Sequence, residues 1–142
     1  MGKLLARLQD PARSGVYRAH RPDEIADAVR GSKLSFARIA LQGASDKSAL
    51  LRTIASALGF PDWFGENWDA LEDCLTDLSW RGAGGHVLVL EGFQFLADDD
   101  IGLLIDVLAS AAEYWAGQGA PFFAVFIDPE GLLLLGELFR EA

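Results

Sequence analysis

Three short runs of strand-forming apolar residues, spaced along the chain with helical patterns between them, constrain the fold most. The runs are "FARIAL" at 36–41, "HVLVLEG" at 86–92 and "FFAVFI" at 122–127. Runs of this length and composition are typical of strands buried on both faces. Strands separated by helices join through right-handed crossovers into a parallel sheet. The sequence therefore predicts an α/β fold with a small three-stranded parallel sheet packed with helices.

Two of the intervening helices have clear ends. The first is predicted at about 47–58, with Asp46 or Ser45 as its N-cap. Its apolar face consists of Leu50, Leu51, Ile54 and Leu58. The other is predicted at about 100–116, where preceding aspartates suit the positive end of the helix dipole. We expect Gly117 to end it in a left-handed cap.

Both ends of the chain extend this unit, and we expect 1–142 to form a single domain with its core at about 36–127. In the N-terminal extension, 1–35, "GVYRAH" predicts a short strand and "RPDEIADAVRG" predicts a helix. Pro22 falls at a plausible first helical position and Gly31 near the end of that helix. The pattern leaves open whether the extra strand joins the sheet.

The last segment, 128–142, predicts a C-terminal helix with Asp128 as its cap and Pro129 as its first residue. Its four consecutive leucines, 132–135, cannot all lie on one face of a helix. Packing across the end of the sheet is favoured for this helix, and a dimer contact is the alternative.

Composition and charge narrow the classes of partner. The chain has 142 residues, 51% of them hydrophobic, and a net charge of −9. Residues 1–33 carry a balance of +3, and residues 34–142 a balance of −12. An acidic domain repels nucleic acid and anionic membranes and attracts basic surfaces. We therefore expect a basic protein as partner, and neither nucleic acid nor a membrane; the oligomeric state stays open.

Other compositional features point to an ordinary cytoplasmic protein. No apolar stretch approaches the roughly 18 residues of a membrane span, and the first residues have Arg and Asp where a signal peptide would be apolar. The one cysteine, Cys74, excludes an internal disulfide and is expected to be a buried apolar residue. His20 and His86 lack metal-ligand spacing, so we expect no metal and no cofactor.

The stretch "FGENWDALEDCLTDL" at 64–78 predicts an acidic helix without a single Lys or Arg. We expect Asn67 as its N-cap, after a turn at Gly65. At about 100° per residue, the apolar side chains gather on one side: Trp68, Leu71, Cys74, Leu75 and Leu78. The acidic side chains gather on the other: Glu66, Asp69, Glu72, Asp73 and Asp77.

This one-signed face has two interpretations. A solvated helix face is the usual outcome for a run of charges. However, Asp69 and Asp77 each lie four residues from Asp73, and each like-charge pair is unfavourable by roughly 0.2 to 0.5 kcal/mol. Asp77 also falls near the negative end of the helix dipole. A pattern that costs stability indicates a use in binding, so these residues by themselves leave both interpretations open.

The longer stretch "FPDWFGENWDALEDCLTDL" at 60–78 resembles the signature of the barstar family, in which an aromatic pair, Gly, Glu and Asn precede Asp-Ala-Leu-x-Asp-Cys-Leu-Thr. "VLVLEGFQF" at 87–95 is similar to the second strand of that family and its exit. The similarity covers about 36–127. It implies a three-stranded parallel sheet with helices, and an inhibitor of a small secreted ribonuclease of the barnase type. It also implies that the inhibitor stays inside the producing cell.

The resemblance further implies which residues contact the active site of the nuclease, where carboxylates replace RNA phosphates against Arg, Lys and His. Asp69 and Asp73 correspond to the two helix aspartates of the family, and Gly65 to the glycine that lets the loop approach its partner. Asn67 and Thr76 correspond to polar contacts. The expected partner-binding residues are Trp63, Phe64, Gly65, Asn67, Trp68, Asp69, Glu72, Asp73, Thr76 and Asp77.

Some positions depart from the family pattern and make the surface more acidic. Glu72 stands where the best-known pattern has Trp, and Asp77 stands where it has Gly. In the third helix, 102–103 offers Gly and Leu where the family has an additional acidic contact. Capping is favoured over that role for the nearby aspartates, Asp98 to Asp100. These departures allow a partner other than a barnase-like ribonuclease.

Two alternatives to an inhibitor remain. Carboxylates four residues apart could bind Mg²⁺ for phosphoryl transfer, although such a site usually adds Lys, Arg or His, and this helix has none. A domain of this fold could also regulate a different basic protein. We favour the inhibitor, and therefore expect no catalytic residues.

Overall fold

A four-stranded parallel sheet forms the centre of the molecule, as seen in a computed structural model that describes residues 2–61 and 65–139. Its order is β1-β4-β3-β2, and every neighbouring pair is parallel. The strands are β1 (Gly15–Ala19), β2 (Ser35–Ala40), β3 (His86–Glu91) and β4 (Phe122–Ile127). The predicted α/β class is therefore confirmed, and the sheet has one strand more than the three expected.

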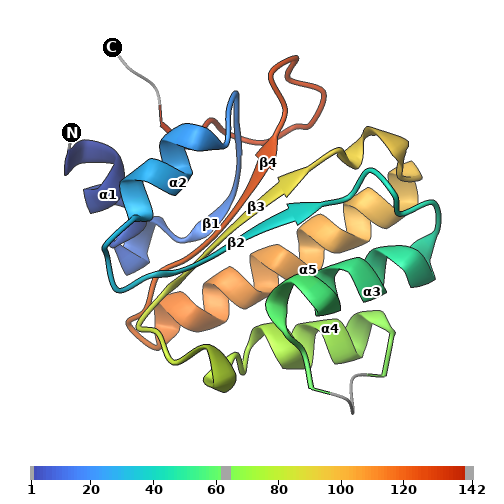
Figure 1. Cartoon of the computed structure of the whole chain (residues 1–142), viewed down its shortest axis with the longest axis horizontal. Helices are drawn as coiled ribbons and strands as arrows, with labels where there is room; N and C mark the ends of the chain where they lie inside the picture. The colour runs from blue at the N-terminus through green and yellow to red at the C-terminus, as the bar shows by residue number, and fades with distance from the viewer. Residues whose placement is uncertain (1, 62–64, 140–142) are drawn as a thin grey trace.

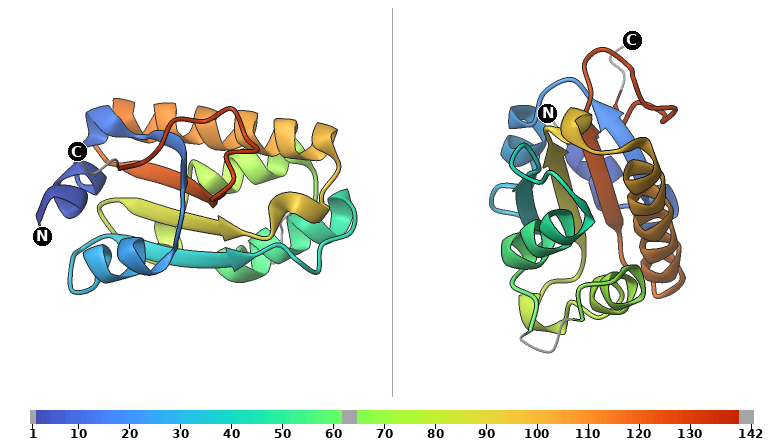
Figure 2. Two further views of the ribbon diagram at one scale, coloured as in Figure 1. Left: turned by 90° about the horizontal axis from the view of Figure 1, so that it is seen from above. Right: turned by 90° about the vertical axis from the view of Figure 1, so that its right-hand side faces the viewer.

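Helices cover both faces of this sheet (Figures 1 and 2). The α-helices are α1 (Gly2–Leu8), α2 (Asp23–Val29), α3 (Lys47–Leu58), α4 (Trp68–Leu75) and α5 (Asp98–Gly117). Short 3-10 helices occur at Pro11–Arg13, Ser79–Arg81 and Phe93–Phe95. The first two α-helices lie on one face and the other three on the opposite face. Helix α1 lies on the other side of the molecule from α4 (Figure 1).

The additional strand is β1, which pairs with the outer edge of β4 from Gly15 opposite Phe123 to Ala19 opposite Ile127. Its sequence has no continuous apolar run, and all five of its residues are only partly buried. An edge strand gains main-chain hydrogen bonds on one side and needs fewer apolar residues than a central one. The strand predicted from "GVYRAH" therefore joins the sheet, which the sequence pattern left open.

The core consists of two apolar clusters that the sheet separates. Along β3, Leu88 and Leu90 point into the cluster with α3, α4 and α5, whereas Val87 and Val89 point into the cluster with α1 and α2. Side chains alternate between the faces of a strand, so a central strand buried on both sides must be apolar throughout. This explains why the central strands are the apolar runs of the sequence.

The two other predicted core helices, α3 and α5, begin near the expected residues. Helix α3 has the predicted bounds, and the Asp46 carboxylate accepts a hydrogen bond from the Ala49 N–H at 2.8 Å. Helix α5 begins at the first of the three aspartates and includes Gly117 as its last residue. The glycine in the left-handed region is Gly119, with φ of 76°, so the predicted cap at Gly117 is wrong by two residues.

The predicted C-terminal helix is wrong, because no helix occurs between residues 128 and 139. The Asp128 carboxylate accepts hydrogen bonds from the N–H groups of Leu132 and Leu133 at 2.9 and 2.8 Å. Gly131, which lies between Asp128 and Leu132 in the chain, has a φ of 68°. These bonds form a tight turn in place of a helix N-terminus, since Asp side chains bond their own backbone equally well in turns.

After this turn the chain bends back and bonds the free edge of β1 around Glu137. The Arg18 N–H donates to the Gly136 carbonyl, and the Leu138 N–H donates to the Arg18 carbonyl, both at 2.9 Å. The leucines alternate in burial: Leu133 and Leu135 pack on the core, whereas Leu132 and Leu134 are 58% and 103% exposed. The edge of β1 thus gives this segment hydrogen bonds that the sequence pattern could not reveal.

Within residues 2–61 and 65–139, no helix is both long enough and apolar enough to span a bilayer. The longest, α5, has 20 residues and an exposed polar side that includes Asp106 and Glu113. Its apolar side packs on the core through residues such as Leu104 and Leu108.

Candidate functional site

Helix α4 begins as the sequence predicts. The Asn67 side-chain oxygen accepts a hydrogen bond from the Ala70 N–H at 2.7 Å, and the Asn67 amide donates to the Gly65 carbonyl at 3.3 Å. Asp69 lies in the first turn, where the helix dipole favours a negative charge. Asn67 therefore fixes both the start of α4 and the end of the loop before it.

The apolar face of α4 holds the helix on the core. Leu71, Cys74 and Leu75 are fully buried, and Trp68 is partly buried against the same cluster. On α5, the Trp115 indole donates a hydrogen bond to the Leu75 carbonyl at 2.8 Å, which satisfies a free carbonyl at the helix end. The predicted apolar side of this helix is confirmed.

Cys74 behaves as a buried apolar residue. Burial, followed by the nearby charges of Asp73 and Asp77, raises the pKa of its thiol. Reactivity requires the thiolate, which these three effects disfavour.

The opposite face of α4 is acidic and largely exposed. Asp69 and Asp73 are exposed, and within the described residues neither carboxylate takes part in an ion pair. Glu66 lies 3.5 Å from the Arg52 guanidinium of α3. Residues 53–80 contain no Lys or Arg at all. The face therefore presents two neighbouring carboxylates that pair with no cation among residues 2–61 and 65–139.

Glu72 differs from these aspartates because it leans toward α5. It is partly buried, and its carboxylate accepts a hydrogen bond from the Ser110 hydroxyl at 3.3 Å. Part of its hydrogen-bonding capacity is already used within the protein. Glu72 accordingly lies at the edge of the acidic face, where α4 meets α5.

Asp77 lies outside the helix, which corrects the predicted end near residue 78. Helix α4 ends at Leu75, and Leu78 adopts a left-handed conformation with φ of 49°. The Asp77 carboxylate accepts a hydrogen bond from the Ser79 N–H at 3.3 Å. Asp73 and Asp77 are therefore not on successive turns of one helix, because the chain leaves the helix to reach the next 3-10 turn.

Asn67 and Thr76, the two expected polar contacts, already form hydrogen bonds within the chain. The loop before α4 is described only in part. The Thr76 hydroxyl donates to the carbonyls of Glu72 and Asp73, at 2.9 and 3.2 Å. A Cβ on Gly65 would lie 3.3 Å from the Asn67 amide nitrogen, a tight but not prohibitive contact. The expected contacts at Trp63 and Phe64 lie outside the described residues.

The acidic segment, residues 58–81, runs from the end of α3 through α4 to the following 3-10 helix. Hydrogen bonds to one carbonyl join its two ends. The Leu58 carbonyl, at the end of α3, accepts from the Trp80 indole at 2.9 Å and from the Arg81 guanidinium at 3.3 Å. The Trp80 ring also lies edge-on to Phe60. The part of the chain that contains all the expected contacts is thus closed at its base by Trp80 and Arg81, a role that their spacing in the sequence did not signal.

A buried polar cluster lies beside this base. His86 is 1% exposed, and a hydrogen bond of 2.7 Å joins its Nδ1 to the Ser35 hydroxyl. The Trp115 ring lies 5.0 Å from the imidazole, between centroids. Burial, with the nearby Arg81 charge as the smaller cause, lowers the pKa of His86 to about 4. The imidazole is therefore neutral at physiological pH and plays a structural part.

The described residues hold no group of three or more His, Cys, Asp or Glu that could bind a metal ion.

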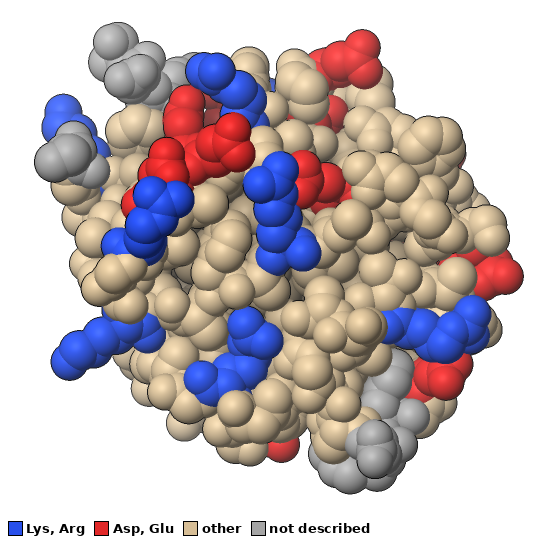
Figure 3. Space-filling model, viewed as in Figure 1, with Lys and Arg blue, Asp and Glu red and all other residues tan. Residues whose placement is uncertain are grey.

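The charges on the face of the molecule with α2 and β2 in front are arranged differently from those of α4. On the face in Figure 3, with α2 and β2 in front, Lys and Arg are spread over the surface and most Asp and Glu lie beside them. The two-sided contacts of Arg38 are an example, with Asp23 at 3.6 Å and Glu91 at 2.5 Å.

The fold and site together define a small α/β domain that exposes an acidic helix, and hydrogen bonds to the Leu58 and Leu75 carbonyls hold that helix in place. Residues 34–127 match the family Barstar, described as barnase inhibitor. The chain belongs to this family. No curated protein matches the chain.

Among solved structures, the chain is similar to the Aeropyrum pernix ORC2 protein in its ADPNP-ADP complexes. The TM-score is 0.49 at 16% identity, over 80% of this chain and 35% of that one. The chain therefore spans about a third of the ORC2 protein's length. This likeness is too low to carry a functional argument.

Proposed function

We propose that the protein is an inhibitor that binds a small basic ribonuclease and blocks its active site with the acidic face of α4. The observation that carries this proposal is the exposed pair Asp69 and Asp73, unpaired within the described residues, in a chain of the Barstar family. The family is described as barnase inhibitor. A ribonuclease active site is lined with cations that hold RNA phosphates, and helix carboxylates can take the places of those phosphates.

Asp73 is the central group of this proposed surface. It lies one turn after Asp69, and its side chain has no partner among the described residues to give up. A partner guanidinium can bind such a carboxylate with two parallel hydrogen bonds. Burial of that pair at the centre of an interface makes its loss costly, because the cation of the partner would stay desolvated and unpaired.

The base of the segment prepares this surface for binding. The Leu58 carbonyl joins the flanks of the loop and helix, and Trp115 holds the end of α4. A rigid surface loses less conformational entropy when a partner binds. Trp80, Arg81 and Trp115 would thus support affinity without touching the partner.

The remaining contacts of the proposed interface surround the two aspartates. They are Trp63, Phe64, Gly65, Asn67, Trp68, Glu72, Thr76 and Asp77. We assign them smaller effects, since Glu72, Thr76 and Asp77 already make hydrogen bonds within the chain. Contacts that surround a hot spot mainly exclude water from it.

The proposal makes the protein a binding protein and not an enzyme. Catalysis of phosphoryl transfer would pair the carboxylates with cations that handle the charge of the substrate. Residues 53–80 supply no Lys, Arg or His. Because a ribonuclease would damage the RNA of the cell that makes it, an inhibitor of this kind is useful in the cytoplasm.

A second basic protein is the alternative partner. The surface carries Glu72 and Asp77 where the best-known family pattern has Trp and Gly, so its shape and charge differ from that pattern. A regulatory domain of this fold would bind its basic partner through the same acidic face without blocking a ribonuclease.

The test is inhibition of a panel of small basic ribonucleases by the purified protein, with binding kinetics in parallel. We expect one member to be inhibited at one-to-one stoichiometry, with an association rate that falls as salt rises from about 0.02 M to about 0.5 M. Tight binding without inhibition would favour the regulatory alternative. Neither binding nor inhibition across the panel, including ribonucleases encoded beside this protein, would contradict the proposal.

A further inference from the structure

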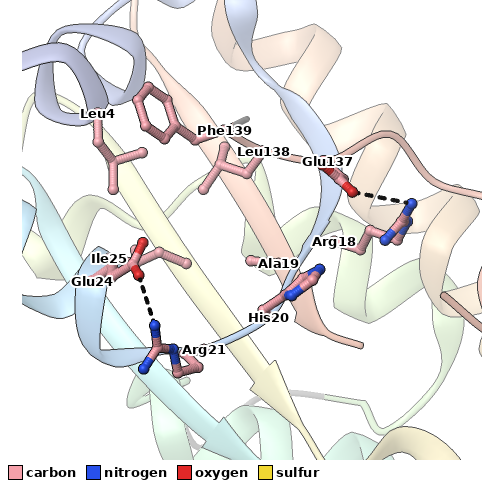
Figure 4. Close-up of a pocket in the computed structure, with 10 residues that line it drawn as sticks. All are labelled: Leu4, Arg18, Ala19, His20, Arg21, Glu24, Ile25, Glu137, Leu138 and Phe139. Atoms are coloured by element: carbon pink, nitrogen blue, oxygen red, sulfur yellow. Dashed lines mark ion pairs between the residues drawn. The ribbon is translucent and has the colours of Figure 1, made fainter. Parts of the chain in front are cut away.

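A pocket of about 290 Å³ lies at the carboxyl end of β1 (Figure 4), and its floor belongs to the apolar cluster on the other face of the sheet from α4. It is enclosed by α1, the connection from β1 to α2, α2 itself and the C-terminal segment. None of the residues that line it falls within 34–127, the part that matches the family. The pocket is therefore a product of the two terminal additions and has no part in the proposed inhibitory surface.

Open α/β sheets commonly bind ligands at the carboxyl ends of their strands, and this pocket lies at the carboxyl end of β1. β1 and β4 are neighbours, yet the chain leaves them toward opposite faces of the sheet. After β1 it enters α2, whereas after β4 it places Leu133 and Leu135 against the cluster of α3, α4 and α5. Ligands of open parallel sheets bind outside the carboxyl ends of the strands at such a switch point.

The floor of the pocket is apolar. Ile25 of α2 and Leu138 of the C-terminal segment are each 1% exposed, and Leu4 and Phe139 are partly buried against the same cluster. The side chains converge from three separate segments of the chain (Figure 4). Such a floor accommodates an apolar group of modest size, since the volume is at the small end of the roughly 300 to 1,000 Å³ typical of ligand pockets.

The rim carries two ion pairs of unequal strength, which lie on opposite sides of His20 in Figure 4. Arg18 lies 3.6 Å from Glu137 and donates a hydrogen bond to the Leu135 carbonyl, with only 22% of its side chain exposed. Arg21 lies 3.6 Å from Glu24, and these side chains are 75% and 65% exposed. An ion pair this exposed contributes at most about 1 kcal/mol, so Arg21 and Glu24 can exchange each other for a ligand.

We propose that this pocket binds a free α-amino acid with an apolar side chain. The ligand carboxylate binds Arg21 and His20, its ammonium group binds Glu24, and its side chain packs on the floor formed by Ile25 and Leu138. A ligand with a net charge would leave one member of the Arg21–Glu24 pair without a partner. A zwitterion replaces both partners, because its two charges lie one carbon apart.

The test is an NMR titration of the full chain with L-phenylalanine and L-leucine. We expect saturable shifts of pocket resonances with at least one of them, and binding at least about tenfold weaker for glycine, which lacks the apolar group. The N-acetyl derivative lacks the ammonium group and the amide derivative lacks the carboxylate, and each should also bind at least about tenfold more weakly. Equal binding of either derivative, or no saturable shift up to about 20 mM, would overturn the proposal.

Helix α2 offers a matched control. Arg30 pairs with Asp27 three residues away, as Arg21 does with Glu24, and it is 76% exposed, but it does not line the pocket. Arg21→Gln should weaken amino-acid binding at least about tenfold, whereas Arg30→Gln should leave it unchanged. Equal effects of both variants would overturn the assignment of the head group. Ribonuclease binding should be the same in both variants, so the outcome is independent of the proposed function.

Discussion

The charges of helix α4 and those of the terminal additions, residues 2–33 and 128–139, are arranged in opposite ways. In the terminal additions, ion pairs join Arg13 to Asp10, Arg18 to Glu137, Arg21 to Glu24 and Arg30 to Asp27. On α4, Asp69 and Asp73 have no such partner within the described residues. Pairing limits repulsion within a fold, whereas unpaired carboxylates stay available to another molecule. In the proposed function, the paired charges stabilise the fold and the unpaired carboxylates of α4 bind the partner.

The largest expected effect is on binding, at Asp73. Asp73→Ala should weaken the complex with the cognate basic partner by more than about 3 kcal/mol, mostly through faster dissociation, a size borrowed from charged hot spots at interfaces such as barnase–barstar. Stability should hardly change, because Asp73 is exposed and lies opposite the buried face of α4. Surface-based binding kinetics and thermal melts measure the two quantities.

Glu72→Ala is the matched control for Asp73→Ala. It removes a carboxylate at the edge of the same face, which is already bonded to Ser110, and should cost under about 1 kcal/mol of binding. Small and equal effects at both positions would exclude the acidic face as the binding site. A collapse of the Asp73 variant's melt would give that residue a structural role.

The next effect concerns acid and the two histidines, His86 beside the base of the acidic segment and His20 in the terminal additions. The pKa of His86 is lowered to about 4 in the folded chain, from an ordinary value of 6.5. The unfolded chain therefore takes up a proton first, and stability should fall as the pH falls from about 6.5 to about 4, by up to about 3 kcal/mol. Urea denaturation at a series of pH values measures this loss.

Variants of the two histidines isolate that effect from the titration of carboxylates. His86→Gln retains a group that can bond Ser35 and should flatten the stability profile over this pH range. His20→Gln, at an exposed position in the terminal additions, should leave the profile unchanged. The same profile for the wild-type chain and His86→Gln would refute a buried neutral imidazole as the cause.

A cation of the terminal additions should matter for stability alone. Arg18 is largely buried, pairs with Glu137 and bonds the Leu135 carbonyl at 2.9 Å. Arg18→Met should lower the free energy of unfolding by about 1 kcal/mol, because a partly buried carbonyl loses its donor, and should not change ribonuclease binding. Denaturation midpoints and binding kinetics test both halves, with Arg30→Met as the exposed control. Weaker binding with intact stability would contradict the division between the two regions.

A substitution at the base of the acidic segment should slightly reduce both stability and partner binding. Trp80→Phe keeps an aromatic ring beside Phe60 but removes the donor to the Leu58 carbonyl, at a cost of about 1 kcal/mol. Faster amide hydrogen exchange should appear in α4 and not in β1, and binding should weaken in proportion. Exchange that rises uniformly along the chain would indicate a global effect and not a local one.

The smallest effect is expected at Asp77. Its carboxylate accepts a bond from the Ser79 N–H beyond the helix end, and asparagine can accept the same bond. Asp77→Asn should change stability by no more than about 0.5 kcal/mol, in the stabilising direction, since one acidic charge leaves a one-signed surface. Thermal melts at low and high salt measure it. A clear loss of stability would mean that the charge itself holds the turn.

Elements bounded by local signals were predictable from the sequence. The Asp46 cap set the start of α3 and the Asn67 cap set the start of α4, because a side chain bonds an N–H three residues later in both. The central strands were recognisable from their continuous apolar runs. Helix ends were less so: α4 stops at Leu75, although the apolar spacing continues to Leu78.

Placements that depend on distant partners were not predictable. The strand at Gly15–Ala19 was predicted, but its place in the sheet depends on the free edge of β4. The segment after Gly131 is not helical, because Arg18 bonds Gly136 and Leu138 across the edge of β1. Trp80 and Arg81 are close to Leu58 only in the folded chain. In each case the deciding hydrogen bond joins residues that sequence periodicity cannot relate.

The sequence by itself determined the alternation of strands and helices, the family, and the one-signed face of α4, because apolar runs, caps and charge spacing act over a few residues. Tertiary structure decided which strand lies beside which, that the terminal additions cover one face of the sheet, and that Leu58, Trp80 and Arg81 close the base of the acidic segment. Those outcomes depend on free sheet edges and unsatisfied carbonyls, whose partners become available only when the whole chain has folded.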